Sequence, residues 1–432
     1  MSDEPSAARV AFYGDDFTGS VDALLQFARR GWTVRLFVGV PDRDVLVDAA
    51  AEVDVVGIAG IARSLGGEAL DDEVRPALEA LAALEPGILQ YKACSTADSS
   101  PEIGNLGRVI ELGRQITGAR VVPLLFAQPD FGRYTVFGHH FAAEAGHIYR
   151  LDRQPTMSHH PATPMTESEL AVHLARQTEL GIGAIPFTAY SSAEALGDLL
   201  VSQGSAAVVL DALDDEHVAL VGRAVARLPA PVFAIGSGGL SLGLARAFDA
   251  EPVALPTSTP TPGPVLVVSG SRSAQTRRQA DAAARAGWHV RPLPVPADDS
   301  SLDAVVELLR AGTSVALTSD DADLPVVGAL AEIAAASAAF VDAAVRVAGA
   351  QRVIVAGGDT SSRVTRLLGV ESLSIAANPW GNVVLLRAHA PGSPLDGVEL
   401  LLKGGQVGVD TLFTDVAALG HDRLREGGRP GR

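Results

Sequence analysis

The sequence predicts an α/β protein with two domains, each built on a mostly parallel sheet flanked by helices. Short apolar runs alternate with segments of helical periodicity, a pattern typical of βαβ units. A proline-rich stretch, residues 251–264, separates residues 1–250 from residues 265–432 and is expected to be an extended linker. After residue 383, strand-like runs follow without an intervening helix, so we expect the second sheet to end in an antiparallel edge.

The individual elements follow from hydrophobic spacing. Helices are predicted at 21–30, 73–84 and 103–116 and after residue 167, where apolar residues recur every three or four positions. Continuous apolar runs predict strands in the first domain at 10–13, 34–38, 53–58, 88–91, 121–126, 182–187, 207–210 and 232–235. In the second domain they predict strands at 265–268, 288–293, 314–317 and 352–355. Residues 129–164, rich in His, Gly and Pro, are expected to form a long and partly irregular excursion, and such segments are often functional.

Composition excludes several classes of partner. The formal charge of −17 argues against nucleic acid or an anionic membrane as the main partner. No apolar run approaches the roughly 20 residues that span a bilayer, and the single cysteine allows no intrachain disulfide, so we expect a soluble cytoplasmic protein. Only two of the 34 basic residues are lysines, Lys92 and Lys403, which makes both of them candidates for a function.

Three glycine- and serine-rich turns in the second domain indicate an anion site. Ser269 and Ser271 follow an apolar strand and precede a helix, so backbone N–H groups and hydroxyls there could bind phosphate, although an ordinary capped turn is equally consistent. A similar turn after the strand at 352–355, and a lysine followed by two glycines near residue 403, would lie at the same edge of a parallel sheet. The candidate residues of these two turns are Gly357, Gly358, Asp359, Thr360, Lys403, Gly404 and Gly405.

Polar residues also follow the strands of the first domain. Asp15 and Asp16 end the first strand, where adjacent carboxylates could accept a hydroxyl proton, hold Mg²⁺ or cap the next helix. Arg63 ends another strand and could bind a substrate carboxylate. The densest polar segment, residues 92–99, has more such groups than capping requires, and a histidine-rich stretch follows later in the chain. The candidate substrate ligands are Arg63, Lys92, Ser95, Asp98 and His160.

Several familiar sites are absent from the sequence. No GxxxxGK[ST] motif exists, so a P-loop is excluded, and the protein-kinase motifs are missing. "GSGGLSLG" from Gly236 matches a dinucleotide fingerprint poorly and is predicted to be a strand–helix turn. The histidines show no recognised zinc spacing, and the sequence identifies no metal ligands.

Six segments in order resemble the four-carbon acid sugar kinase family, which includes 3-oxo-tetronate, threonate and erythronate kinases. They are "DDFTG", "YKACSTADSSPEIGNLG", "HPATPMTESEL", "VVSGSRS", "GGDTS" and "LKGGQVG", and they span nearly the whole chain. The family often has an aromatic residue where this chain has Ala97, and residues 129–160 look longer and richer in histidine than in tetronate kinases.

The resemblance implies a sugar-acid-binding first domain and a nucleotide-binding second domain, with ATP as the phosphoryl donor and Mg²⁺ bridging its phosphates. It implies ATP contacts at Ser271, residues 357–360 and Gly404 or Gly405, with Asp15, Asp16, Arg63, Lys92 and Asp98 facing the sugar acid. We therefore expect a kinase acting on a terminal hydroxyl of a small sugar acid, with Asp15 or Asp16 as the catalytic base and with a homodimer allowed. Two alternatives stay open: a sugar-acid sensor with a degenerate nucleotide site, and a dinucleotide-dependent dehydrogenase.

Overall fold

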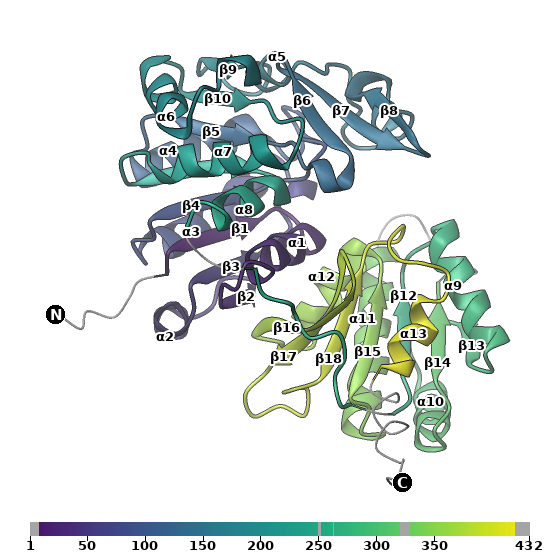
Figure 1. Ribbon diagram of the computed structural model, residues 1–432. Coiled ribbons are helices and arrows are strands. Elements are labelled where there is room, and N and C mark those ends of the chain that lie inside the picture. Colours follow the sequence, from purple (N-terminus) through teal and green to yellow (C-terminus); the bar gives the residue numbers. More distant parts are fainter. Residues whose placement is uncertain (1–7, 249–251, 262, 320–328, 420–432) are drawn as a thin grey trace, which may run out of the picture. The chain divides into compact units, whose positions relative to one another are not determined.

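The computed structural model describes residues 8–248, 252–261, 263–319 and 329–419. The chain divides into two compact units, Met1–Val253 and Ala254–Arg432. Each unit has a mostly parallel sheet flanked by helices, and the sheet of the second unit ends in antiparallel strands, so the expected fold class is confirmed (Figure 1).

The sheet of the first unit is parallel throughout, in the order β2-β3-β1-β4-β11-β5-β10-β9. Its strands are β1 Val10–Gly14, β2 Val34–Val38, β3 Val55–Ala59, β4 Ile88–Lys92, β5 Val122–Leu125, β9 Ile182–Ile185, β10 Ala207–Leu210 and β11 Val232–Gly236. Strands buried on both faces are continuous apolar runs, which is why the sequence predicts most of them. In register, Gly14 pairs with Ala59 and with Lys92, and Lys92 pairs with Gly236. The loops that follow these strands therefore leave the sheet at one edge.

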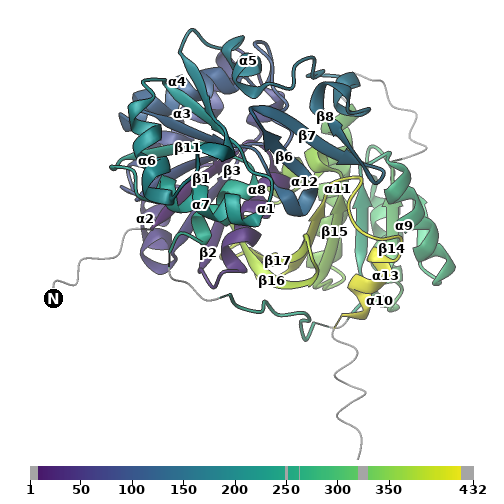
Figure 2. The same ribbon diagram turned by 45° about the horizontal axis from the view of Figure 1, so that its top comes forward.

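A small antiparallel sheet stands apart from this main sheet (Figure 2). It comprises β6 Arg133–Val136, β7 His139–Glu144 and β8 His147–Arg150. Residues 133–150 are thus regular strands, and the remainder of the segment at 129–164, which the sequence predicts to be partly irregular, contains short 3₁₀ turns and loops. Both hairpin turns have two residues with positive φ, Phe137–Gly138 and Ala145–Gly146, and neither shows the Asn-Gly or Asp-Gly signal that usually reveals a tight hairpin.

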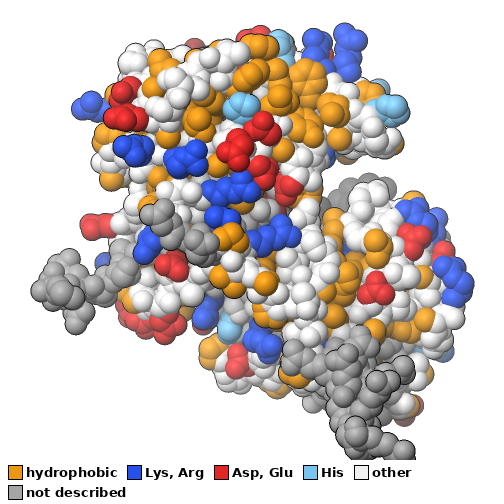
Figure 3. Space-filling model, viewed as in Figure 1, with side chains coloured by type: hydrophobic (Ala, Val, Ile, Leu, Met, Phe, Trp, Pro, Cys, Tyr) orange, Lys and Arg blue, Asp and Glu red, His pale blue; other side chains and the backbone are white. Residues whose placement is uncertain are grey.

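Helices cover both faces of the main sheet in the first unit. The helices α2 Arg43–Glu52, α3 Glu68–Ala82, α4 Leu106–Thr117 and α5 Leu170–Ala175 share one hydrophobic core with the sheet. The helices α1 Phe17–Ala28, α6 Ala193–Ser202, α7 Asp215–Ala226 and α8 Gly238–Ala245 pack in a row against the other face. Acidic and basic side chains lie side by side over α7 and α8 (Figure 3), where Arg246 pairs with Asp215 at 2.9 Å. Exposed pairs of this kind contribute little to stability, so this face needs no functional explanation.

The sheet of the second unit has the order β13-β14-β12-β15-β18-β17-β16. The strands β12 Leu266–Ser269, β13 His289–Pro292, β14 Val315–Thr318, β15 Arg352–Ala356 and β18 Glu399–Lys403 are parallel, and β16 Ser372–Trp380 and β17 Val383–His389 complete the antiparallel edge. The helices α9 Ala274–Arg285 and α13 Leu412–Ala418 share a core with one face, while α10 Asp299–Arg310, α11 Ala329–Arg346 and α12 Gly358–Leu367 pack together. Ser269 pairs with Ala356, and Ala356 with Lys403, so the three candidate turns begin at one edge.

The proline-rich stretch is attached to the second unit over part of its length. Thr259 and Thr261 both donate hydrogen bonds to the buried carboxylate of Glu399, and the Asn378 N–H donates to the carbonyl of Pro256. Glu399 in turn pairs with buried Arg352 at 2.8 Å. Residues 251 and 262 of the predicted linker lie outside the described residues. Among the helices that the structure describes, none is long and apolar enough to cross a membrane.

Candidate active site

The first cluster of polar side chains lies where β1, β3 and β4 end. Asp15 and Asp16 follow β1, Arg63 lies in a 3₁₀ turn after β3, and Lys92 is the last residue of β4. Because these strands are parallel neighbours in register, their ends bring the four side chains together, as the sequence predicts.

Arg63 is the centre of this cluster. Its Nη2 lies 2.7 Å from Asp15 Oδ1 and 2.8 Å from Asp16 Oδ1, while its Nε and Nη1 donate to the second oxygens of the same two carboxylates. Four of the five guanidinium donors are therefore engaged by aspartates. The cluster is built as a carboxylate–guanidinium–carboxylate unit rather than as a free arginine fork.

The two aspartates differ in their surroundings. Asp16 is the N-cap of α1, and its Oδ1 accepts from the Gly19 N–H at 2.8 Å, so it has the capping role that the sequence allowed. Asp15 is almost completely buried, and that burial, only partly offset by Arg63, raises its pKa to about 6. Asp15 therefore has a basicity that suits proton transfer near neutral pH.

Lys92 lies near Asp22, a carboxylate that is not among the candidate residues from the sequence. Its buried Nζ donates to the Ala93 carbonyl at 2.9 Å and lies 4.0 Å from Asp22 Oδ2. Asp22, on α1, also accepts from Gln26 and from Gln128, a buried residue after β5. Asp22 lies six residues after Asp16, and no local pattern in the sequence points to Gln128.

The loop after β4 brings Asp98 to the same place. Asp98 Oδ2 lies 4.0 Å from Arg63 Nε, and Asp98 Oδ1 accepts from the Thr96 hydroxyl at 2.9 Å. Arg63 lowers the pKa of Asp98 despite its burial, so this carboxylate is ionised. The carbonyl of Ser95 is held by His140, a buried residue of β7 that the sequence analysis missed. Ser95 and Asp98 are thus in one ordered loop beside Arg63.

His160 is not joined to this cluster by any contact of the described residues. Its Nδ1 instead accepts from the backbone N–H and hydroxyl of Thr163, in the segment after the small sheet. A role for His160 in substrate binding stays a prediction. The described residues also include no group of three or more His, Cys, Asp or Glu side chains placed to hold a metal ion.

The second cluster lies at the strand ends of the second unit. Ser273, the N-cap of α9, donates to the Gly405 carbonyl at 2.5 Å, and Ser271 Oγ lies 3.2 Å from Ser273 Oγ. Ser269, at the end of β12, accepts at its Oγ from the Ser271 N–H. The turn after β12 and the turn after β18 are therefore tied together, as expected for one site.

Two glycines allow close approach of the backbone in this cluster. A Cβ atom on Gly405 would lie 2.5 Å from Ser271 Oγ, and one on Gly357 would lie 3.1 Å from Thr360 Oγ1. Gly357 has φ 118° and, as the N-cap of α12, has no side chain to cap the first N–H groups of that helix, a position where an anion could bind. Gly358 begins α12, whereas Gly404 has no close contact with the serine turn, and the side chain of Asp359 lies outside the described residues.

Lys403 is a buried cation in this cluster. Its Nζ donates to Thr276 Oγ1 at 2.9 Å and to the Gly405 carbonyl at 3.3 Å, both neutral acceptors. Within the described part of the chain, no carboxylate pairs with it. Burial lowers its pKa to about 8. A buried ammonium with neutral partners, next to the N-terminus of α12, fits a bound anion such as a phosphate.

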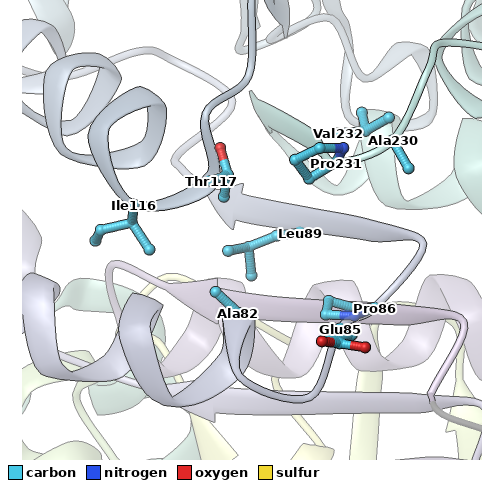
Figure 4. Close-up of a pocket in the computed structure, with 9 residues that line it drawn as sticks. All are labelled: Ala82, Glu85, Pro86, Leu89, Ile116, Thr117, Ala230, Pro231 and Val232. Atoms are coloured by element: carbon cyan, nitrogen blue, oxygen red, sulfur yellow. The ribbon is translucent and has the colours of Figure 1, made fainter.

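A separate pocket of about 340 Å³ lies at the opposite edge of the first sheet (Figure 4). It is lined mainly by apolar side chains at the amino ends of β4 and β11, among them Leu89, Ile116 and Pro231. None of the candidate residues lines it, so the polar clusters and this pocket are distinct.

Comparison with known families agrees with this division of the chain. A family described as a sugar-binding N-terminal domain matches residues 10–244, and one described as a nucleotide-binding C-terminal domain matches residues 266–413. The chain belongs to the four-carbon acid sugar kinase family. The enzyme class expected from the sequence, a sugar-acid kinase, is confirmed.

Members of this family match the chain from end to end. A 3-oxo-isoapionate kinase of Paraburkholderia graminis is 38% identical, covering 95% of this chain and 94% of that protein. A 3-oxo-tetronate kinase of Pseudomonas fluorescens is 31% identical over 93% of this chain and 94% of that protein. The crystal structure of a Salmonella typhimurium LT2 protein, described as a tRNA synthase, is 27% identical with a TM-score of 0.76 and covers 95% of this chain and 98% of that one. That likeness supports the fold.

Proposed function

We propose that this protein transfers the γ-phosphoryl group of ATP to a terminal hydroxyl of a small 3-oxo sugar acid. The observation that carries the proposal is Asp15, a buried carboxylate whose pKa lies near 6 beside Arg63, Asp98 and Lys92. A base of that strength is ionised at neutral pH yet basic enough to accept a hydroxyl proton as the phosphoryl group arrives.

The acceptor is a 3-oxo acid by analogy with the relatives. The 38% identical relative acts on 3-oxo-isoapionate and a 31% identical one on 3-oxo-tetronate. We place 3-oxo-isoapionate first among candidates and 3-oxo-tetronate second, with threonate and erythronate after them.

In the proposed reaction the acceptor oxygen forms a bond to the γ-phosphorus, and the bond from that phosphorus to the β,γ-bridging oxygen breaks. The hydroxyl proton passes to Asp15, and ADP leaves. Lys92 and the one Arg63 donor that the two aspartates leave free bind the substrate carboxylate, while Ser95 and Asp98 orient the hydroxyl groups. Asp16 holds Arg63 in place through its two contacts.

The nucleotide phosphates would be bound in the second unit. Backbone N–H groups at the start of α12, the hydroxyls of Ser269, Ser271 and Thr360, and the ammonium of Lys403 are the donors suited to them. Mg²⁺, supplied with the nucleotide, would neutralise charge on the transferred group. The turns after β12, β15 and β18 would supply the protein's contacts to the phosphates.

A coupled assay of ADP release tests the proposal. The wild-type chain should phosphorylate 3-oxo-isoapionate, 3-oxo-tetronate or a related acid with ATP and Mg²⁺, and mass spectrometry of the product should place the phosphate on the terminal oxygen. Asp15→Asn should bind ATP with wild-type affinity and turn over at least about a hundredfold more slowly. Binding of a sugar acid without ATP binding would favour the sensor instead. Light scattering on the same preparation tests whether the chain forms the homodimer that the sequence allows.

A further inference from the structure

The loop at residues 94–99, which carries Ser95 and Asp98, contains a conformation that needs outside support. Ala97 has φ 49°, in the left-handed region that non-glycine residues rarely adopt. Such a backbone is strained and persists where surrounding contacts impose it. The contacts that hold this loop therefore bear on how Asp98 reaches Arg63.

One of these contacts comes from the small antiparallel sheet. His140, fully buried on β7, has its Nε2 2.8 Å from the Ser95 carbonyl oxygen and its Nδ1 2.9 Å from Thr135 Oγ1. A carbonyl can only accept, so Nε2 carries the proton. Burial lowers the pKa of His140 to about 4, which leaves the imidazole neutral at pH 7, and Nδ1 accepts from the Thr135 hydroxyl. Both ring nitrogens are thus committed in one tautomer.

The small sheet is itself fixed to the first unit. Asp211, after β10, accepts from the backbone N–H groups of Phe137 and Gly138 at 2.6 and 2.9 Å. Thr135 and Ala212 exchange two backbone hydrogen bonds, each of 3.1 Å, and the His140 N–H donates to Ser168. His140 therefore reaches the loop from an anchored position.

A second buried histidine supports the other end of the loop. His173 on α5 has its Nε2 3.0 Å from Ser99 Oγ, and the Ser99 hydroxyl lies 3.0 Å from the Ala97 carbonyl. Burial lowers the pKa of His173 to about 4 as well. The strained residue thus lies between two histidine contacts, one at Ser95 and one at Ser99.

We propose that His140 is a positioning residue of the acceptor site: it ties the Ser95 carbonyl to the small sheet and so holds the 94–99 loop in the conformation that presents Asp98 to Arg63. The segment that the sequence marks as unusually rich in histidine thereby gains a role in acceptor binding. The role of His140 in acceptor binding rests on the proposed function. The link between His140 and the conformation of the 94–99 loop can be measured without that function.

Kinetics of a matched set of variants provide the first test. His140→Phe fills the space but loses the donor, whereas His140→Gln can keep an N–H near the Nε2 position. His139→Phe is the control, because His139 lies on the same strand and its ring contacts Ser168 rather than the loop. His140→Phe should raise KM for the sugar acid about tenfold, the effect of one buried hydrogen bond, and leave KM for ATP unchanged. His140→Gln should recover most of the loss, and the control should behave as wild type.

The only cysteine of the chain provides a second readout that does not depend on activity. Cys94 is half-buried in the loop, its Sγ lies 3.1 Å from Thr96 Oγ1, and burial raises its pKa to about 11. A neutral thiol reagent should modify Cys94 at least about fivefold faster in His140→Phe than in wild type or the control, because opening of the loop exposes it. If His140→Phe does not fold, Thr135→Val, which removes only the hydroxyl that orients the ring, should give the same changes at smaller size.

The outcomes separate the two proposals. Unchanged Cys94 reactivity together with an unchanged sugar-acid KM in His140→Phe would overturn the role of His140. Equal rises in KM for sugar acid and ATP would also overturn it, because they indicate a general structural defect. A wild-type chain without kinase activity would overturn the proposed function, while faster Cys94 modification in His140→Phe would still establish the link between His140 and the loop.

Discussion

Arg63 binds Asp15 through two hydrogen bonds, from Nη2 to Oδ1 at 2.7 Å and from Nε to Oδ2 at 3.3 Å. An arginine this close usually lowers the pKa of a carboxyl group, yet the pKa of Asp15 is raised to about 6. Burial of Asp15 is the larger effect, and the nearby charge of Asp16, which shares the same guanidinium, acts in the same direction. Arg63 thus limits the rise in pKa.

This balance predicts the acid limb of the pH profile. Asp15 must be ionised to accept a proton, so kcat/KM for the sugar acid should fall about tenfold per pH unit below pH 6 and level off above it. Measurement from pH 5 to pH 8 checks the limb. In Asp15→Asn the residual rate should lose this acid limb. Asp16→Asn should keep an acid limb but shift it to lower pH, because the charge of Asp16, which raises the pKa of Asp15, is removed while asparagine still caps the helix. Wild-type turnover in Asp15→Asn would contradict the assignment.

Removal of the guanidinium should move that limb. In Arg63→Gln the charge that lowers the pKa of Asp15 is lost, so the pKa should rise and the acid limb should shift to higher pH. Activity at pH 6 should then fall about tenfold more than activity at pH 8. Circular dichroism and ATP binding serve as controls for folding. An acid limb that stays at its wild-type position would show that Asp15 does not set it.

The sequence predicts the parallel strands well because most of them are continuous apolar runs buried on both faces, although β13 is polar and partly exposed. It does not predict β16, whose residues Ser372–Trp380 include Asn378 and Pro379 and whose pairing with β17 is interrupted by register shifts. The sequence also does not predict the strands β6, β7 and β8 of the small sheet, because they are short and their turns lack the usual turn residues.

The same reasoning separates the predicted site residues from the missed ones. Asp15, Arg63 and Lys92 directly follow or end neighbouring parallel strands, so topology alone places them together. Gln128 and His140 reach the cluster through tertiary contacts that no local pattern encodes. The scarcity of lysine was informative, since both lysines are buried and each belongs to one of the two polar clusters.

Lys403 predicts proton uptake when nucleotide binds. Its pKa is lowered to about 8 by burial, so near pH 8 about half of the unliganded protein carries a neutral lysine. A phosphate beside Nζ favours the ammonium form, and binding should therefore take up about half a proton per nucleotide at pH 8 and less at pH 6.5. Titration calorimetry in two buffers of different ionisation enthalpy measures this number. The Lys403→Met variant should bind the nucleotide more weakly and should take up no proton on binding. Unaltered proton uptake in this variant would exclude Lys403 as its source.

The two glycines after Lys403 form a matched pair for testing the nucleotide site. A Cβ on Gly405 would lie 2.5 Å from Ser271 Oγ, whereas the nearest atom to a Cβ on Gly404 is 3.4 Å away, an ordinary contact with Val407. Gly405→Ala should displace the serine turn and raise KM for ATP about tenfold with little change in KM for the sugar acid. Gly404→Ala should raise KM for ATP much less. Steady-state kinetics with each substrate varied in turn measures both KM values in the two variants. An equal rise in KM for ATP in Gly405→Ala and Gly404→Ala would mean that the serine turn beside Gly405 does not bind the nucleotide.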